Sequence, residues 1–206
     1  MAINTLPIIG IRRLRMGSDG TGIRTLIGLY GCPLRCRYCL NPQSWNGHLT
    51  PVKYTPGKLY DKVHIDNLYF QASGGGLTFG GGEPLLHMPA IAAFANLCPN
   101  SWNLWAETSL YVKRPIVEAA SKVFQHFVVD IKTANDDIYR NYTGGDLKFA
   151  LDNLLYLKSL IGPDRITVRI PLIPGFTDTQ VQRASIEYIS SLGFVDIDTF
   201  AYKTDI

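Results

Sequence analysis

The feature that most restricts how this chain can fold is a group of three cysteines placed directly after a strand-like apolar run. Residues 25–30 form that run, and Cys32, Cys36 and Cys39 follow it with the spacing C-x3-C-x2-C. The glycine and proline around Cys32 end a strand and release the chain into a loop, whose backbone can wrap around a compact group. Because thiolates are soft ligands and the chain shows no secretory features, the three cysteines indicate a metal centre rather than disulfides.

The identity of the metal depends on whether the sequence offers a fourth ligand. A structural zinc site is closed by four ligands, usually two pairs of Cys or His, and no such fourth residue lies nearby. Cys98 is far downstream in an apolar helical pattern and is interpreted as a core residue. A [4Fe–4S] cluster normally takes four cysteines, so three would leave one iron open to a substrate or cofactor. The donor set favours iron–sulfur, with zinc as the alternative.

Short apolar runs alternate with helical patterns along the rest of the chain. Strands are predicted at 8–15, 23–30, 77–79, 103–107, 127–131, 165–172 and 196–201, and helices at 55–70, 89–97, 116–124, 146–160 and 179–192. This alternation predicts an α/β fold with right-handed crossovers, and about six βα units are too few for an eight-stranded barrel. No linker or repeat interrupts it, so residues 1–206 are predicted to form a single domain with a hairpin arm at about residues 5–20.

Composition and charge exclude several classes of function. The hydrophobic fraction of 46% and the charged fraction of 18% are those of a globular protein. A net charge of +3 is too mild to indicate nucleic-acid binding. No apolar run approaches the roughly 20 residues that span a bilayer, and the first residues lack the features of a signal peptide. We expect a monomer in a reducing cytoplasm, with no membrane and no nucleic acid among its partners.

Arginines are unevenly distributed and gather near the cysteines in the sequence. They are Arg12, Arg13, Arg15, Arg24, Arg35 and Arg37. One interpretation is a solvated or locally paired surface. The other is a positive rim that docks an acidic electron donor, since charge complementarity mainly raises the rate of association.

Glycine-rich and polar motifs come directly after the predicted strands. They are SDGTGIRT (18–25), the cysteine loop ending in LNP (40–42), GGGLTFGGGEPLL (74–86), DIK (130–132), YTG (142–144) and IPGFTD (173–178). Because ligands in parallel α/β folds sit at the carboxyl ends of the strands, these motifs can converge on one pocket. In this order the series resembles the glycyl-radical-enzyme activating enzymes of the radical S-adenosylmethionine (SAM) superfamily, over nearly the whole chain.

The resemblance implies an open, partial (β/α)6 barrel that binds a [4Fe–4S] cluster and SAM. Cys32, Cys36 and Cys39 would ligate the cluster, whose open iron would be chelated by SAM. The residues expected to contact SAM are Tyr38, Asn41, Gly81, Gly82, Glu83, Lys132 and Arg169. A monovalent cation beside SAM is implied at Glu107, Thr108 and Asp130.

The residues by themselves allow other interpretations of this site. Residues 80–83 could be a flexible turn, and Tyr38 could only shield the cluster. Asp130 and Lys132, two apart on a strand, share a face and could form a buried ion pair. Two positions depart from the family pattern, because Glu107 replaces an aspartate and Lys203 replaces a SAM-contacting histidine.

The resemblance also implies an activity and partners. The reduced cluster would donate an electron to SAM, and the resulting 5′-deoxyadenosyl radical would abstract hydrogen from a glycine of a partner glycyl radical enzyme. Residues 40–80 contain no cysteine, so a ferredoxin-like insert is absent and a flavodoxin- or ferredoxin-like protein would supply the electron. The segments 136–146 and 174–178 are predicted to be loops that recognise the partner.

Three other functions remain open on the sequence. They are an activase of anaerobic ribonucleotide reductase, a radical SAM enzyme acting on a small molecule, and a non-catalytic iron–sulfur or zinc binding module. The last would bind metal but never cleave SAM, so a measurement of SAM cleavage separates it from the others.

Overall fold

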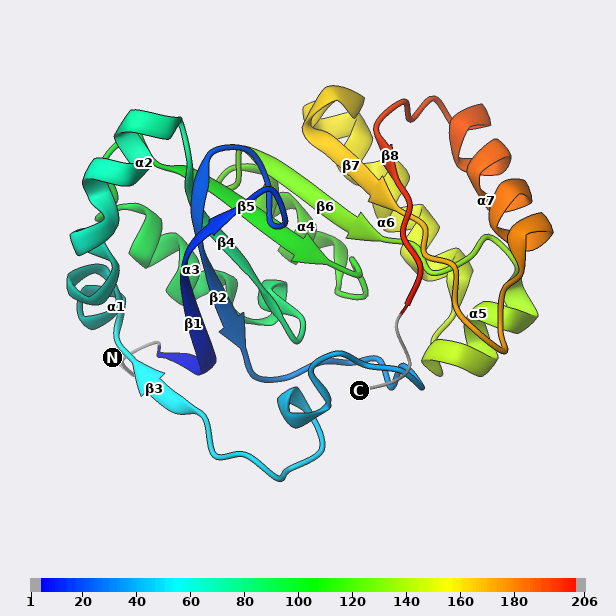
Figure 1. Ribbon diagram of the computed structural model, residues 1–206, viewed down its shortest axis with the longest axis horizontal. Coiled ribbons are helices and arrows are strands. Elements are labelled where there is room, and N and C mark those ends of the chain that lie inside the picture. Colours follow the sequence, from blue (N-terminus) through cyan, green and yellow to red (C-terminus); the bar gives the residue numbers. More distant parts are fainter. Residues whose placement is uncertain (1–4, 203–206) are drawn as a thin grey trace.

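An eight-stranded sheet organises the computed structural model, which describes residues 5–202 (Figure 1). Six parallel strands run through it in chain order: β2 (Ile23–Leu29), β4 (Gly76–Gly81), β5 (Asn103–Thr108), β6 (His126–Asp130), β7 (Ile166–Arg169) and β8 (Ile197–Asp198). Two antiparallel strands, β1 (Leu6–Met16) and β3 (Val52–Tyr54), extend the sheet beyond β2. The sheet does not close, since β3 and β8 are its edges. The predicted open, partial (β/α)6 barrel is confirmed.

Helices connect the parallel strands and cover the sheet (Figure 1). They are α1 (Pro56–Val63), α2 (Asn67–Ser73), α3 (Met88–Ala95), α4 (Arg114–Ser121), α5 (Asp136–Thr143), α6 (Leu147–Ile161) and α7 (Thr179–Ser191). Side-chain caps define several of their starts, because Thr55, Asn135 and Asp178 accept hydrogen bonds from backbone N–H groups three residues on. Within residues 5–202, no helix is both long enough and apolar enough to cross a membrane.

The core lies between the sheet and its helices. Strand β4 is buried along almost its whole length, as expected for a parallel strand covered on both faces. Phe79 on this strand makes edge-on contacts with Phe94 and Phe124, whose ring centroids lie 5.7 and 5.9 Å away. Each of these fully buried rings contributes about 2–3 kcal/mol through removal of its surface from water. The core therefore fixes β4, the strand that leads into the glycine-rich turn.

Two local predictions differ from the structure, and one is extended by it. The expected helix 55–70 is interrupted by a 3-10 turn at His64–Asp66, where the buried Asp66 carboxylate accepts hydrogen bonds from Arg13 and Thr25. The expected hairpin is formed by β1 and β2, which pair antiparallel, and β1 also pairs with β3 on its other side. The segment 136–146, predicted to be a loop, contains helix α5, which the Asn135 cap begins and a left-handed Gly144 ends.

Candidate functional site

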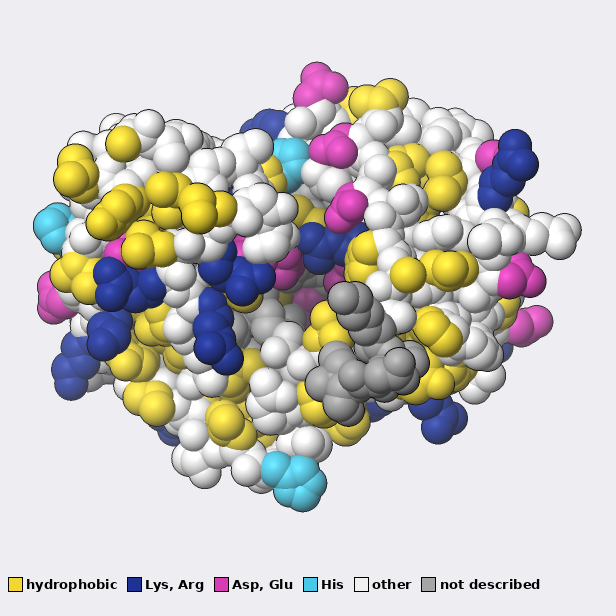
Figure 2. All heavy atoms as spheres, in the orientation of Figure 1, with side chains coloured by type: hydrophobic (Ala, Val, Ile, Leu, Met, Phe, Trp, Pro, Cys, Tyr) yellow, Lys and Arg dark blue, Asp and Glu magenta, His cyan; other side chains and the backbone are white. Residues whose placement is uncertain are grey.

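A pocket opens at the carboxyl ends of the parallel strands, between the cysteine loop and the last strands. Figure 2 shows this region hollowed near the centre of the molecule, with acidic and basic side chains in and around the hollow. Its lining residues are Cys32, Leu34, Cys36, Cys39, Leu40, Asn41, Gly81, Gly82, Glu83, Glu107, Thr108, Ser109, Asp130, Lys132, Arg169, Phe200 and Tyr202. Apart from Tyr38, every residue predicted for the cluster, SAM or the cation lines it. Sequence positions up to 137 residues apart, from Cys32 to Arg169, therefore meet in one place.

The cysteine loop leaves β2 and is anchored on helix α5. The backbone N–H groups of Arg35 and Arg37 donate to the carbonyls of Thr143 and Tyr142 at 2.8 and 3.0 Å. All three loop cysteines are free and half-buried, and each lines the pocket. Among residues 5–202, no three Cys, His, Asp or Glu side chains lie close enough together to ligate one metal ion. The three thiols are instead spread around the pocket wall. Three thiolates are soft donors, so this set is chemically suited to an iron–sulfur cluster.

Whether these cysteines are neutral thiols or thiolates depends on whether they bind a metal. Burial, with a smaller contribution from the negative charge of the nearby Glu83, raises the pKa of the Cys32 thiol to about 12. Burial also raises the pKa of Cys36 to about 11, while the positive charge of Lys132 opposes that shift. Because a metal binds the thiolate, loading of this site must release the thiol protons.

The glycine-rich turn supports the start of the cysteine loop by close backbone contact. A Cβ on Gly81 would lie 2.8 Å from the Gly28 Cα, and a Cβ on Gly82 would overlap the Gly31 carbonyl oxygen. Without side chains the two segments lie close enough for the Gly82 N–H to donate to the Leu29 carbonyl at 2.9 Å. The turn is therefore packed rather than flexible, and glycine is required because a side chain would fill the space between the two segments.

Glu83, at the end of this turn, is fully buried with both carboxylate oxygens occupied. Oε1 accepts from the Thr108 hydroxyl at 2.6 Å and the Leu85 N–H at 3.2 Å. Oε2 accepts from the Ser109 N–H at 2.9 Å and the Ser109 hydroxyl at 2.6 Å. Burial raises the pKa of Glu83, and these hydrogen bonds oppose the shift. The carboxylate ties the turn after β4 to the end of β5.

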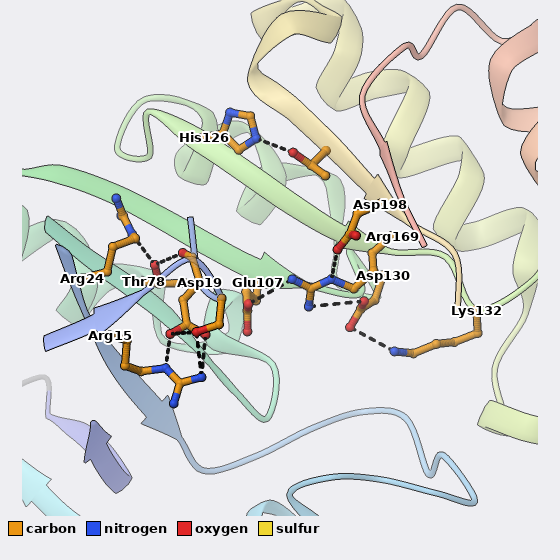
Figure 3. A network of polar contacts seen from close by, with 12 residues as sticks. Arg15, Asp19, Arg24, Thr78, Glu107, His126, Asp130, Lys132, Arg169 and Asp198 are labelled. Atoms are coloured by element: carbon orange, nitrogen blue, oxygen red, sulfur yellow. Dashed lines mark hydrogen bonds and ion pairs between the residues drawn. The ribbon is translucent and has the colours of Figure 1, made fainter. Parts of the chain in front are cut away.

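The opposite wall of the pocket carries a network of ion pairs (Figure 3). Lys132 Nζ lies 2.9 Å from Asp130 Oδ2, so the ion pair that the spacing allowed is present. Arg169 Nη2 lies 3.3 Å from Glu107 Oε1, and its Nε lies 3.2 Å from Asp198 Oδ2. Burial lowers the pKa of Lys132, but Asp130, Tyr202 and Cys36 together hold it well above the usual value. This wall therefore presents fixed positive charges beside the cysteines.

Two residues predicted to contact SAM lie at the margin of the site. Tyr38 is 39% exposed and packs edge-on against Phe176 and Tyr142, with ring centroids 5.8 and 6.4 Å away. Asn41 lines the pocket and precedes the 3-10 turn Pro42–Ser44. Lys203, expected from the resemblance to stand in place of a family histidine, lies outside the described residues.

Several residues that line the pocket were not predicted from the sequence. Ser109 donates two hydrogen bonds to Glu83, from its N–H and its hydroxyl. Its position directly after the predicted Glu107-Thr108 pair, at the end of a strand, was the sequence signal that could have identified it. Phe200 and Tyr202 come from the segment after β8, whose packing over Arg169 and Lys132 has no sequence signature. Aromatic rings there limit the access of water to the charged wall.

The arginines near the cysteine loop are of two kinds. Arg13 pairs with Asp66, Arg15 pairs with Asp19, and Arg24 is fully buried over the Trp105 ring. Arg35 and Arg37 instead line a second hollow, together with Arg140, Cys36 and Cys39. Local pairing therefore explains part of the sequence cluster, while the second hollow is basic and reaches two of the cysteines.

Comparison with known sequences identifies similar proteins. The family model of the Radical SAM superfamily matches residues 26–185. A pyruvate formate-lyase-activating enzyme from Staphylococcus aureus is 32% identical over 191 residues, which is 86% of this chain and 73% of that protein. The family model therefore covers the cysteine loop, the glycine-rich turn, Lys132 and Arg169, and it ends before β8.

Comparison with solved structures supports the fold. Streptococcus suis SuiB bound to S-adenosylmethionine aligns with a TM-score of 0.66 and 14% identity, over 84% of this chain and 39% of that chain. This chain thus spans well under half the length of SuiB. A radical SAM methyltransferase from Sphaerobacter thermophilus aligns with a TM-score of 0.61 and 18% identity, over 95% of this chain and 67% of that chain.

Proposed function

The chain belongs to the radical SAM superfamily, and we propose that its role within it is to activate a glycyl radical enzyme. Membership makes a [4Fe–4S] cluster and SAM its cofactors. The observation that carries the finer assignment is the 32% identity to pyruvate formate-lyase-activating enzyme over most of the chain. Its substrate would then be a glycine residue of a partner protein, and pyruvate formate-lyase is the first candidate.

Different residues of the pocket would bind the cluster and SAM. Cys32, Cys36 and Cys39 would hold the cluster, which with bound SAM supplies a radical that abstracts hydrogen. The turn at Gly81 and Gly82 offers backbone polar groups to the methionyl part of SAM, because no side chain stands in front of them. Packing of the turn against the cysteine loop keeps these groups in place relative to the thiols. The chain itself binds, orients and excludes water, so the proposal needs no general base.

The openness of the sheet supports a macromolecular substrate. The sheet ends at β8, a two-residue strand, and does not close on β3. A pocket at the end of an open sheet leaves room for a polypeptide segment to reach the lining residues. Helix α5 lies beside the cysteine loop and occupies the segment predicted to recognise the partner.

The test has two stages, both anaerobic. Reconstituted and reduced protein is mixed with SAM, and 5′-deoxyadenosine is quantified against Cys36→Ala. Pyruvate formate-lyase is then added, and its glycyl radical is measured by electron paramagnetic resonance. We expect deoxyadenosine and a glycyl radical from the native protein and neither from Cys36→Ala. SAM cleavage without a radical on this partner or on anaerobic ribonucleotide reductase would favour a small-molecule substrate, and no SAM cleavage would favour a binding module.

We further propose that the reductant is an acidic one-electron carrier, flavodoxin-like or ferredoxin-like, that docks on the basic hollow. Arg37 and Arg140 line it beside Cys36 and Cys39, which also line the SAM pocket. Their positive charges would accelerate association with an acidic surface. The double variant Arg37→Gln/Arg140→Gln should slow reduction by flavodoxin at low salt, while Arg183→Gln on α7 should not. A reduction rate that is independent of salt in the native protein would refute this docking.

A further inference from the structure

The guanidinium group of Arg169 lies at the centre of the acidic residues predicted to hold a monovalent cation (Figure 3). Arg169 is paired in register with Asp130 on β6 and with Asp198 on β8. Its three nitrogens face three different carboxylates: Nη2 faces Glu107 at 3.3 Å, Nη1 faces Asp130 at 3.9 Å, and Nε faces Asp198 at 3.2 Å. The ring of Phe200 covers the guanidinium, whose carbon lies 5.8 Å from the ring centroid.

The length of Glu107 is what brings it to Arg169. Strand β6 lies between β5 and β7, so their backbones are two strand spacings apart, about 9.5 Å. Aspartate, one methylene shorter, would not extend as far across β6. Room for the longer side chain comes from Gly80, where a Cβ would lie only 3.0 Å from Glu107 Oε2. The departure from the family's aspartate therefore has a structural consequence in this chain.

The other two predicted cation ligands are also engaged by protein groups. The Thr108 hydroxyl donates to Glu83 Oε1 at 2.6 Å and accepts from the Leu110 N–H at 2.9 Å. Asp130 Oδ2 pairs with Lys132 at 2.9 Å. Asp130 Oδ1 has no hydrogen-bond partner among residues 5–202 and lies 3.9 Å from Arg169 Nη1.

The two acids predicted to hold the cation are matched by two basic side chains. Glu107 and Asp130 carry two negative charges, and Arg169 and Lys132 carry two positive ones. The buried Glu83 carboxylate is held separately, by hydrogen bonds from Thr108, Ser109 and Leu85. Asp198 is about half exposed, so its charge is partly solvated. A cation placed between Glu107 and Asp130 would lie beside two fixed positive charges and would be repelled by both. The residues present do not suit a bound monovalent cation.

We propose that Arg169 is the built-in counterion of this site and that the protein binds SAM without a monovalent cation. The Arg169 guanidinium would neutralise Glu107 and Asp130, as a bound cation would do. Arg169 is in this sense a positioning residue, because it fixes Glu107 and Asp130 at the pocket wall.

The first test uses the cluster-loaded native protein and needs no turnover. The dissociation constant of SAM is measured by equilibrium dialysis in potassium, sodium and choline chloride at equal ionic strength. We expect the three values to agree within twofold. Weaker binding in choline by more than twofold would overturn the proposal. Since SAM binding needs no protein partner, that result would leave the proposed activation of a glycyl radical enzyme unaffected.

The second test restores the shorter acid with Glu107→Asp. This variant should lose contact with Arg169 and leave an ion-sized space, so we expect SAM to bind at least fivefold more tightly in potassium than in choline. Glu118→Asp, the same change on the exposed face of α4, is the matched control and should stay insensitive. The melting temperature of cluster-free Glu107→Asp should also rise with potassium. If Glu107→Asp is as insensitive as the native protein in both measurements, Arg169 is not the counterion.

Discussion

The two walls of the pocket are built by different kinds of interaction. The wall formed by the glycine-rich turn meets the cysteine loop through backbone contacts that leave no room for a side chain, and Glu83 has both oxygens occupied. The wall formed by β6, β7 and β8 is held by ion pairs at 2.9–3.9 Å on partly exposed side chains. Steric exclusion and hydrogen bonds are lost within a fraction of an ångström, whereas Coulomb attraction falls gradually with distance. The first wall therefore tolerates almost no displacement, whereas the stability of the second decreases more gradually when a charged side chain shifts.

The largest expected effect is on the steric wall, from Gly82→Ala. The new Cβ would overlap the Gly31 carbonyl oxygen, so the turn and the cysteine loop must separate. We expect a loss of about 3 kcal/mol in the free energy of unfolding, measured by denaturant titration of the cluster-free protein. Gly57→Ala in α1 is the control, because its Cβ meets nothing within 4 Å. Equal stability of the two variants would mean that close steric contact does not hold the glycine-rich turn against the cysteine loop.

The next effect is expected from Glu83→Gln on the same wall. The amide replaces one accepting oxygen by a donor that must face Thr108 and Leu85, or Ser109. We expect a loss of about 2 kcal/mol in unfolding free energy, because a buried donor is left facing another donor. The comparison variant is Gln71→Glu on the exposed face of α2, which should change stability little. A native-like denaturation midpoint for Glu83→Gln would show that the four hydrogen bonds to the Glu83 carboxylate do not stabilise the fold.

A smaller effect is expected when the pH is lowered. His87 Nε2 donates to the Tyr30 carbonyl at 2.7 Å, next to the start of the cysteine loop, and burial lowers the pKa of His87. A pKa lowered by folding means that the neutral imidazole stabilises the fold above the ordinary value of 6.5, and that this contribution is lost as the pH falls below it. The native protein should therefore lose stability relative to His87→Gln between about pH 7 and pH 5. Parallel stability curves for the two proteins would contradict this.

The smallest effect is expected on the charged wall, from Asp198→Asn. Its carboxylate is about half exposed, and Arg169 keeps Glu107 and Asp130 as partners. We expect a change below about 1 kcal/mol in unfolding free energy, reduced further at high salt. A loss as large as that of Gly82→Ala would show that the charged wall is as rigid as the steric one.

Much of the site could be predicted because its residues follow strands. In a parallel sheet the carboxyl ends of all strands face one edge, so the order of strands in the sequence already brings Cys32, Glu83 and Asp130 together. Helix α5 was not predicted because it is only eight residues long and mostly polar, although Asn135 and Gly144 are ordinary helix-capping residues. The place of Tyr38 was also not predictable, since it depends on a contact with Phe176 from a distant segment.

The sequence by itself determined which chemistry the chain supports. Three thiols after a strand, and glycines and charges after the following ones, are properties of residue type and order, and order is what places groups along a parallel sheet. Only the tertiary structure decided how those groups are used. That Gly82 supports the cysteine loop and that Glu107 reaches Arg169 across β6 depend on contacts between strands. Such contacts are fixed by packing distances, which a linear sequence does not record.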